Sequence, residues 1–190
     1  AFRQHDQQRP AQSGNVSDVS LGLYGEERFG TLYADLGGLV GWDHNSEKRL
    51  IAAPGISRQA SGGFDGMSAG VIGRVGDRIS MSGGWTLEPR VGFEWSHVDQ
   101  NAYTESGAGG ADLAVGGAHQ DAVQSLLGAR VSRDFSAALS GEASLDWAHD
   151  FNDLTPRGAE SFAAAPGTAF GIAGVNPGRD AALIRAWRSW

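Results

Sequence analysis

The sequence predicts an all-β fold, an antiparallel up-and-down transmembrane β-barrel of which about eight strands are visible. Three observations predict it: strict two-residue alternation in several segments, a high glycine content, and connections that alternate between short and long. The clearest alternation covers 85–96 (WTLEPRVGFEWS), where apolar residues and one proline alternate with polar residues and one glycine. Such a period of two is typical of a strand with two unlike faces.

The amino-acid composition excludes several classes of protein. The chain has 29 glycines among 190 residues and 19% charged residues, a balance that argues against a helical bundle. It has no cysteine, which excludes a disulfide framework, a thiolate metal site and a cysteine nucleophile. The net charge of -7 disfavours a nucleic-acid partner, because phosphate contacts need a concentrated basic face. No apolar run is long enough for a transmembrane helix, and no signal peptide opens the chain.

The same alternation predicts the other strands. In 31–43 the even positions Leu36, Val40 and Trp42 are apolar, and Leu145 and Trp147 continue a similar pattern later in the chain. The predicted strands are 16–25, 31–43, 67–81, 85–96, 123–135, 139–147, 168–175 and 180–190. Average hydropathy does not separate a membrane barrel from a soluble β protein, because lipid-facing and lumen-facing side chains alternate along membrane strands.

The connections between the predicted strands alternate in length. Short ones are expected at 26–30, 82–84, 135–138 and 176–178, and long polar ones at 44–57, 99–119 and 152–166. Antiparallel strands with short turns at one end and long loops at the other are typical of outer-membrane barrels.

Tryptophans give a check on strand length. Trp85 and Trp95 share a face ten residues apart, about 33 Å along a strand. Tilted by about 40°, that span projects to roughly 25 Å, the height of the lipid-facing band between two aromatic girdles. Trp42 and Trp147 would join Trp95 in the outer girdle. Pro89 lies within the same strand, and because proline cannot donate to a sheet ladder, we expect a bulge or a frayed rim there.

Five phrases, taken in order, resemble the β-barrel translocator domain of autotransporters, the type V secretion proteins of Gram-negative bacteria. They lie at 21–43, 83–115, 125–135, 145–153 and 162–183, and the second reads GGWTLEPRVGFEWSHVDQNAYTESGAGGADLAV. The resemblance implies a twelve-stranded barrel in the bacterial outer membrane. It also implies that this barrel anchors an N-terminal passenger and helps export it to the cell surface, with the barrel-assembly machinery and outer-membrane lipid as partners.

The resemblance also sets the expected domain organisation. The chain lacks counterparts of the opening helix, the first strands and the last strand or two, so we expect an incomplete copy of the family's barrel. Residues 1–15 are polar and without apolar periodicity, and we expect a tether or the remnant of a preceding element there. Residues 16–190 are then the autotransporter-like barrel domain.

The resemblance favours assigning the two faces of the strands to a lumen and to lipid. Charges of both signs occupy the polar face, where neighbouring strands allow them to pair; the alternative is a solvated face of a soluble sheet. The predicted lumen-facing residues are Glu88, Arg90, Glu94, Arg130, Asp134, Glu142 and Asp146. The predicted lipid-facing or girdle residues are Trp42, Trp85, Leu87, Val91, Phe93, Trp95, Leu145 and Trp147.

We expect no catalytic, cofactor or metal site. The five histidines lack metal-ligand spacing, and no G-x-S-x-G sequence occurs. The glycine-rich stretch 107–117 is not followed by the lysine of a phosphate-binding loop. Some autotransporters cleave their own passenger at two adjacent asparagines, a pair that this sequence lacks.

Two other classes stay open at this stage. One is a porin or adhesin barrel, in which loops 44–57 and 99–119 would bind a ligand. The other is a soluble β-sandwich or lectin-like module, which would bury one face of its strands as a core and fold in buffer without detergent.

Overall fold

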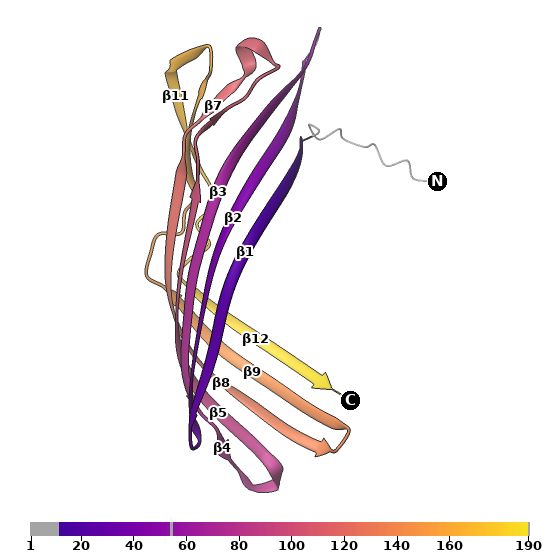
Figure 1. Ribbon diagram of the computed structural model, residues 1–190, viewed down its shortest axis with the longest axis vertical. Helices are drawn as coiled ribbons and strands as arrows, with labels where there is room; N and C mark the ends of the chain where they lie inside the picture. Colours follow the sequence, from indigo (N-terminus) through magenta and orange to yellow (C-terminus); the bar gives the residue numbers. More distant parts are fainter. Residues whose placement is uncertain (1–11, 54, 190) are drawn as a thin grey trace, which may run out of the picture.

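The computed structural model describes residues 12–53 and 55–189, and most of them lie in antiparallel β-strands. The main sheet, here called the wall, has the strand order β1-β2-β3-β5-β8-β9-β12, and Figure 1 shows these strands side by side. Its strands are β1 (Gln12–Phe29), β2 (Leu32–Ala53), β3 (Ile56–Asp77), β5 (Trp85–Gln100), β8 (Ala118–Ser136), β9 (Leu139–Asp150) and β12 (Asp180–Ser189). The antiparallel β fold expected from the sequence is confirmed.

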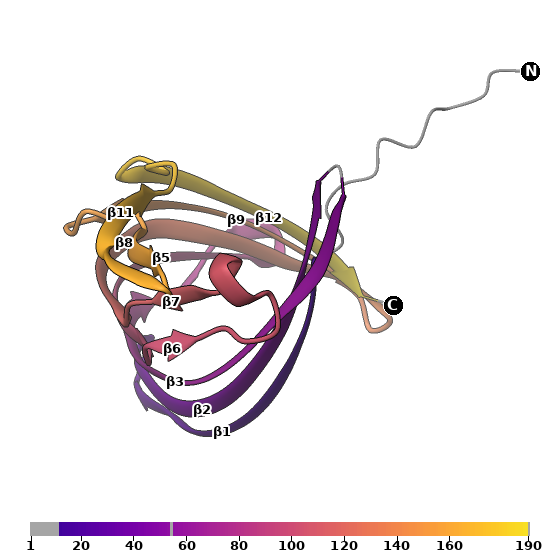
Figure 2. The same ribbon diagram turned by 90° about the horizontal axis from the view of Figure 1, so that it is seen from above.

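The wall is strongly curved, as the view from above shows (Figure 2). Because side chains on the inside of a curved sheet converge and those on the outside diverge, burial identifies the two faces. Glu88 is 3% exposed, whereas its neighbours in the alternation Val91 and Phe93 are 55% and 47% exposed. The polar phase of the alternation therefore lies on the concave face and the apolar phase on the convex face.

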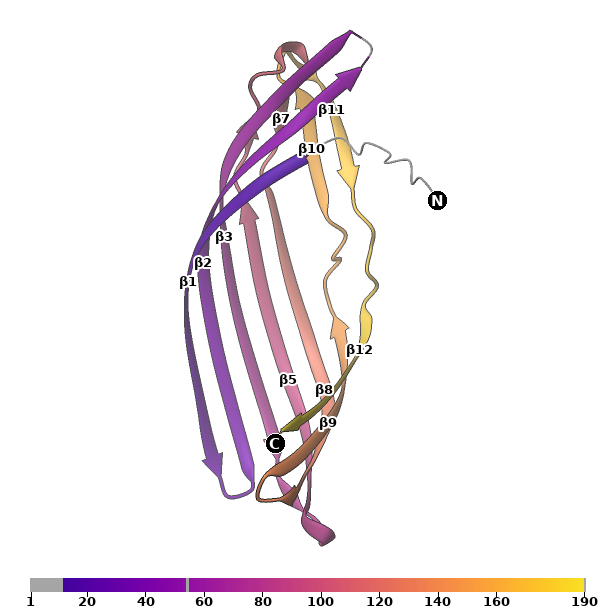
Figure 3. The ribbon, with the colours of Figure 1, turned by 90° about the vertical axis from the view of Figure 1, so that its right-hand side faces the viewer.

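A second, smaller sheet stands at one end of the wall (Figure 3). Its order is β11 (Ala165–Ala173), β10 (Arg157–Phe162), β7 (Leu113–Val115) and β6 (Tyr103–Thr104). These strands come from the connections between β5 and β8 and between β9 and β12. At the other end the turns are short: Gly30, with φ of 69°, takes part in the turn between β1 and β2, and β4 (Ile79–Ser80) and a short helix at Ser82–Gly84 precede β5.

Two expectations about the connections are wrong. Residues 44–57 are not a long loop, because β2 and β3 extend to Ala53 and from Ile56, pairing in register over their whole length. The strand expected at 168–175 is present as β11, which ends at Ala173 and pairs with β10 in the small sheet and not with the wall. Consequently 176–178 is not a turn at the short-turn end but part of the connection from β11 to β12. Residues 44–57 are rich in polar residues, so the sequence pattern indicated a loop where the structure has paired strands.

Pro89 causes no bulge. Glu88, Pro89 and Arg90 pair in register with Arg130, Ala129 and Gly128 of β8. On the other side of β5 the ladder is interrupted, because β3 ends at Asp77 and β4 begins at Ile79, directly opposite the proline. The missing N–H donor of proline fits this gap.

The wall has two outer edges, those of β1 and β12. Within the described residues β1 pairs only with β2, and β12 only with β9. With seven strands in the order, β1 and β12 run in the same direction. A closed barrel with antiparallel pairs throughout would therefore require an odd number of further strands between these edges. None of the described helical segments has the length and apolar content to cross a membrane.

Residues 1–11 of the expected tether lie outside the described residues, as does Trp190, and residues 12–15 form the start of β1.

The long β2–β3 hairpin is testable by engineered disulfides, since the chain has no native cysteine. Lys48 and Ser61 are register partners, so we expect Lys48→Cys with Ser61→Cys to form a disulfide under mild oxidation, within the roughly 4.4 to 6.8 Å Cα separation that a disulfide spans. Lys48→Cys with Gly63→Cys, two residues out of register, serves as control and should crosslink much less. Equal crosslinking of both pairs would indicate a mobile loop. Gel mobility before and after reduction measures the result.

Candidate functional site

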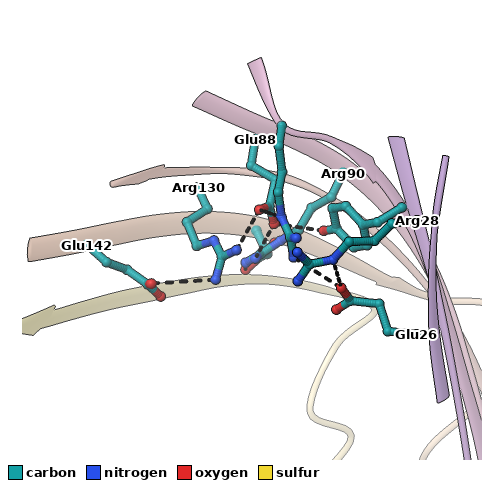
Figure 4. Close-up of polar contacts among 9 residues, drawn as sticks. Glu26, Arg28, Glu88, Arg90, Arg130 and Glu142 are labelled. Carbon is teal, nitrogen blue, oxygen red and sulfur yellow. Dashed lines mark hydrogen bonds and ion pairs between the residues drawn. The ribbon is translucent and has the colours of Figure 1, made fainter. Parts of the chain in front are cut away.

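A network of charged side chains crosses the concave face near the short-turn end of the wall, and Glu88 of β5 is its centre (Figure 4). The Glu88 side chain is 4% exposed. Its carboxylate accepts hydrogen bonds from the Tyr33 hydroxyl at 2.7 Å, from Arg130 at 2.5 Å and from Arg78 at 3.2 Å. Arg90 lies 3.9 Å from the same carboxylate. Burial of this charge is thus offset by several charged or polar donors, the condition under which buried ions persist.

Other ion pairs extend this network across the wall. Arg90 donates two hydrogen bonds to Asp146, at 2.8 and 2.7 Å, in the bidentate geometry that suits guanidinium and carboxylate. Arg130 reaches Glu142 at 3.5 Å. The remaining pairs join Arg78 to Glu26 (3.6 Å), Arg28 to Glu26 (2.5 Å) and Arg185 to Asp146 (3.5 Å). With Tyr33 included, these residues, here called the concave-face network, come from β1, β2, the β3–β4 junction, β5, β8, β9 and β12.

Two glycines make room for this network. Arg90, Gly128 and Asp146 are successive register partners on β5, β8 and β9, so the Arg90–Asp146 pair spans the strand between them. A Cβ atom at Gly128 would collide with the Asp146 carboxylate and lie 2.6 Å from the Leu145 carbonyl oxygen. Likewise the Tyr33 ring lies over Gly76, where a Cβ would be 2.5 Å from the ring. At both glycines the missing side chain leaves a gap, here called a slot, through which a side chain crosses the intervening strand and reaches the strand beyond it.

The structure brings together five of the seven residues predicted to face a lumen: Glu88, Arg90, Arg130, Glu142 and Asp146. Glu94 is on the same face and lines a hollow with Arg74 and Arg90, without belonging to the ion pairs described above. Asp134 is exposed at the end of β8, next to a register shift between Asp134 and Ser136.

Sequence reasoning missed part of the network. The missed members are Tyr33, Glu26, Arg28, Arg78 and Arg185. Tyr33 and Glu26 occupy positions of the two-residue alternation that face the concave side, so the alternation could have identified them. Arg78 lies between β3 and β4, where no alternation applies.

The eight residues predicted to face lipid or a girdle have their side chains on the convex face. Trp42, Val91, Phe93, Leu145 and Trp147 are each between 47% and 57% exposed, and Trp85, Leu87 and Trp95 are half-buried. Their register is consistent, since Trp95 pairs with Val71 and Trp147 with Leu127.

A second polar cluster fastens the β5–β8 connection to the far ends of β2 and β3. Glu105 is 4% exposed; it accepts hydrogen bonds from Arg49 at 3.1 and 2.5 Å and from the Leu113 amide at 2.9 Å. Ser61 and Ser106 exchange two backbone hydrogen bonds. Tyr103 stacks on Phe64 and donates to Glu47 at 2.5 Å; burial and this bond raise the pKa of the Tyr103 phenol, so it remains a neutral donor.

No group of three or more histidine, aspartate or glutamate residues in 12–53 and 55–189 is placed to bind a metal ion. The arrangement on the concave face consists instead of paired charges, with four carboxylates balanced by five guanidinium groups. Chemically it offers a polar, hydrogen-bonding surface.

We expect Glu88→Gln to destabilise the fold by about 1 to 3 kcal/mol, because Arg130, Arg78 and Arg90 would then face one another without their shared counter-ion. Glu142→Gln is the matched control: its side chain is 39% exposed and its contact with Arg130 is 3.5 Å, so its loss should cost at most about 0.5 kcal/mol. Urea unfolding in detergent, followed by circular dichroism, compares the two variants. Equal effects would contradict the central position of Glu88.

Gly128→Ala should cost about 1 to 3 kcal/mol through overpacking between β8 and β9. Gly158→Ala in β10 is the control, since a Cβ there meets nothing within 4 Å. The same unfolding measurement applies, and a tolerated Gly128→Ala would show that Asp146 does not need the slot.

Comparison with known proteins gives the family. A family model described as the autotransporter beta-domain matches residues 4–187. Two curated relatives are extracellular serine proteases of Serratia marcescens, 28% and 29% identical over 175 residues, which are 87% of this chain and 16% of each relative. The chain thus spans about a sixth of the length of the relatives it matches. Since the family model covers almost the whole chain, the resemblance noted in the sequence is confirmed: the chain belongs to the autotransporter β-domain family.

Proposed function

We propose that this chain is an outer-membrane translocator and anchor that helps export an N-terminal passenger to the bacterial cell surface. Domains of this family are translocators embedded in the outer membrane of bacteria. The anchoring role, the lipid contact and the assembly partners of this chain are our inference.

The observation that carries the proposal is that the wall is polar where it is buried and apolar where it is exposed. Among the described residues the buried apolar side chains are only Tyr33, Ala60, Ala108 and Ala148. Glu88, Asp146, Ser144 and Asp150 are buried instead. Large apolar side chains such as Leu127, Leu36 and Val75, 50% or more exposed, cover the convex face. Exposing so much apolar surface to water is energetically unfavourable, whereas contact with lipid acyl chains is favourable.

In this proposal the convex face contacts outer-membrane lipid and the concave face lines a lumen. The lumen-facing set is Glu88, Arg90, Glu94, Arg130, Asp134, Glu142 and Asp146. Between its outer edges the wall pairs its strands along most of their length, and such pairing is what lipid-exposed backbone requires. An unfolded passenger would pass along the polar face, where charged side chains and water can hydrogen-bond to its backbone. The end with the small sheet then faces outward and the short turns face the periplasm, and the barrel-assembly machinery would insert the chain.

The alternatives fit the structure less well. A soluble β-sandwich requires a second layer on the apolar face, and the small sheet instead extends the wall at one end (Figures 1 and 3). A ligand-binding adhesin would use long free loops, but 44–57 is a strand hairpin and 99–119 is fastened through Glu105.

We infer no catalytic role for this chain. The name of the Serratia relatives describes a protease activity of those whole proteins, of which this chain matches 16% of the length. Export of a passenger needs a pathway and an anchor, and the concave-face network supplies paired charges for the wall of that pathway.

Substitutions on the two faces of β5 test the lipid assignment. Leu87→Arg and Phe93→Arg should each lower the stability of the membrane-inserted form by about 2 to 4 kcal/mol, since arginine on the lipid face is costly near mid-bilayer. Glu94→Gln on the opposite face should be tolerated. Recovery of the compact, boil-sensitive gel band after reconstitution measures the effect, and equal tolerance at all three sites would contradict the assignment.

Surface display tests the function itself. A reporter domain fused before Ala1 and expressed in a Gram-negative host should reach the cell surface, where protease added to intact cells removes it. The same fusion with Phe93→Arg should leave the reporter protected. A chain recovered in the soluble fraction, or a reporter that stays inside in both cases, would overturn the proposal.

A further inference from the structure

The sequence Trp-x-His occurs three times, each time in a wall strand that runs toward the end with the small sheet. The three copies are Trp42-Asp43-His44 in β2, Trp95-Ser96-His97 in β5 and Trp147-Ala148-His149 in β9. Because residues two apart on a strand share a face, each histidine stands beside its tryptophan on the convex face. The rings are close in two copies, with centroids 6.2 Å apart for Trp95 and His97 and 5.7 Å for Trp147 and His149.

Each of these histidines is paired with an aspartate on the next wall strand. His44 Nδ1 lies 2.7 Å from Asp65, His97 Nδ1 lies 2.9 Å from Asp121, and His149 Nδ1 lies 2.8 Å from Asp180. All three pairs are direct register partners. The Trp147 indole also donates to Asp180, at 3.1 Å. We call these nine residues the Trp-His-Asp row.

The row has a constant step. Trp95 pairs with Val71, which pairs with Gly38, four residues before Trp42. Trp147 pairs with Leu127, which pairs with Val91, again four residues before Trp95. The three units therefore form one slanting line across the convex face. On strands that are tilted to the membrane, residues at one membrane depth are offset from strand to strand in this way.

The chemistry of the row suits the headgroup layer. Tryptophan on a lipid-facing surface prefers the boundary between acyl chains and headgroups. Two residues further along a strand tilted by about 40° is roughly 5 Å further out, so the histidines reach headgroup level. The aspartate occupies Nδ1 in every pair and leaves Nε2 for another partner. A protonated imidazole then donates Nδ1–H to the aspartate and Nε2–H to an anionic oxygen outside the protein.

We propose that the Trp-His-Asp row binds the phosphate groups of lipid headgroups, with each imidazolium bridging its aspartate and one phosphate oxygen. The proposal rests on the proposed function, which places the convex face in the outer membrane. Phosphate is the anionic oxygen acceptor that lipids present in the headgroup layer. Lipids diffuse in the membrane, so a headgroup can come into contact with each histidine.

The surroundings of the histidines predict how binding depends on pH. On the other side from its aspartate each histidine faces an uncharged register partner, namely Ser17, Ala69 and Ser125. Asp99 and His119 face each other one step beyond His97. When the imidazoles lose their protons, the row retains only the charge of its aspartates, which repels phosphate. Binding should therefore weaken as the pH rises and imidazolium gives way to its neutral form.

The test compares two lipids that differ by one phosphate. The full chain is reconstituted in dodecyl maltoside micelles containing either phosphatidic acid or diacylglycerol, with EDTA present so that no cation bridges aspartate to phosphate. The temperature at which the compact gel band is lost should be about 4 °C higher with phosphatidic acid at pH 6, and the difference should largely vanish at pH 8. A structural role of the His-Asp pairs alone would stabilise both preparations equally.

The triple variant His44→Gln, His97→Gln, His149→Gln should lose this lipid difference, and His119→Gln, on the same face but not preceded by tryptophan, should keep it. If the triple variant does not fold, His44→Gln alone, whose side chain is 68% exposed, should lose about a third of the difference. An unchanged difference in these variants, or a difference equal at both pH values, would overturn the proposal.

Two further arms separate the remaining explanations. Inorganic phosphate added to diacylglycerol micelles should not reproduce the shift, and if it does, lipid is not the source of the phosphate. A chain that forms no compact band in any micelle contradicts the proposed function, and with it this inference. A compact band without any lipid difference overturns this inference alone.

Discussion

The proposed function rests on one constraint: a chain segment exposed to lipid must pair every backbone N–H and C=O within the protein. Continuous antiparallel pairing meets this constraint from Gln12↔Arg49 at one end of the wall to Asp180↔His149 at the other. With the backbone paired, the alternating side chains lie on opposite faces of the wall, polar on the concave face and apolar on the convex face. The outer edges of β1 and β12 have no strand partner among the described residues, and their common direction restricts how a barrel closes.

The concave-face network turns separate hairpins into one wall. Backbone pairing joins only strands that are adjacent in the wall. In contrast, Arg90 reaches Asp146 over Gly128, and Tyr33 reaches Glu88 over Gly76. These contacts join strands that are not neighbours, so they oppose splaying of the sheet. The same charges keep the concave face polar, and one set of residues thereby serves both cohesion and the proposed passage of a passenger.

The faces of the wall were predictable from sequence because a strand has a period of two, which is a local property. The alternation in 85–96 places Glu88 and Arg90 opposite Val91 and Phe93 without any knowledge of partners. The network was not predictable, because it requires the register between β5, β8 and β9, and a glycine such as Gly128 gives no sign of which side chain crosses it. The hairpin at 44–57 was hidden for another reason: its strands extend beyond the apolar region, so polar residues on both faces resembled a loop. The Trp-x-His copies were visible in the sequence, but only the register brings an aspartate to each.

The most direct test of the account is cysteine scanning along β5. Each residue from Thr86 to Trp95 is replaced by cysteine, which becomes the sole thiol of the chain. After reconstitution in vesicles, each variant is treated with a membrane-impermeant maleimide. In a parallel preparation without maleimide, a fluorophore is attached to the same thiol and its quenching by spin-labelled lipid is measured. The account predicts a period of two in the quenching: odd positions from Leu87 onward are quenched by lipid and are not labelled from water, and even positions are not quenched. Uniform labelling along the strand, or quenching at Glu88 and Arg90, would contradict a wall with its polar face inside and its apolar face in lipid.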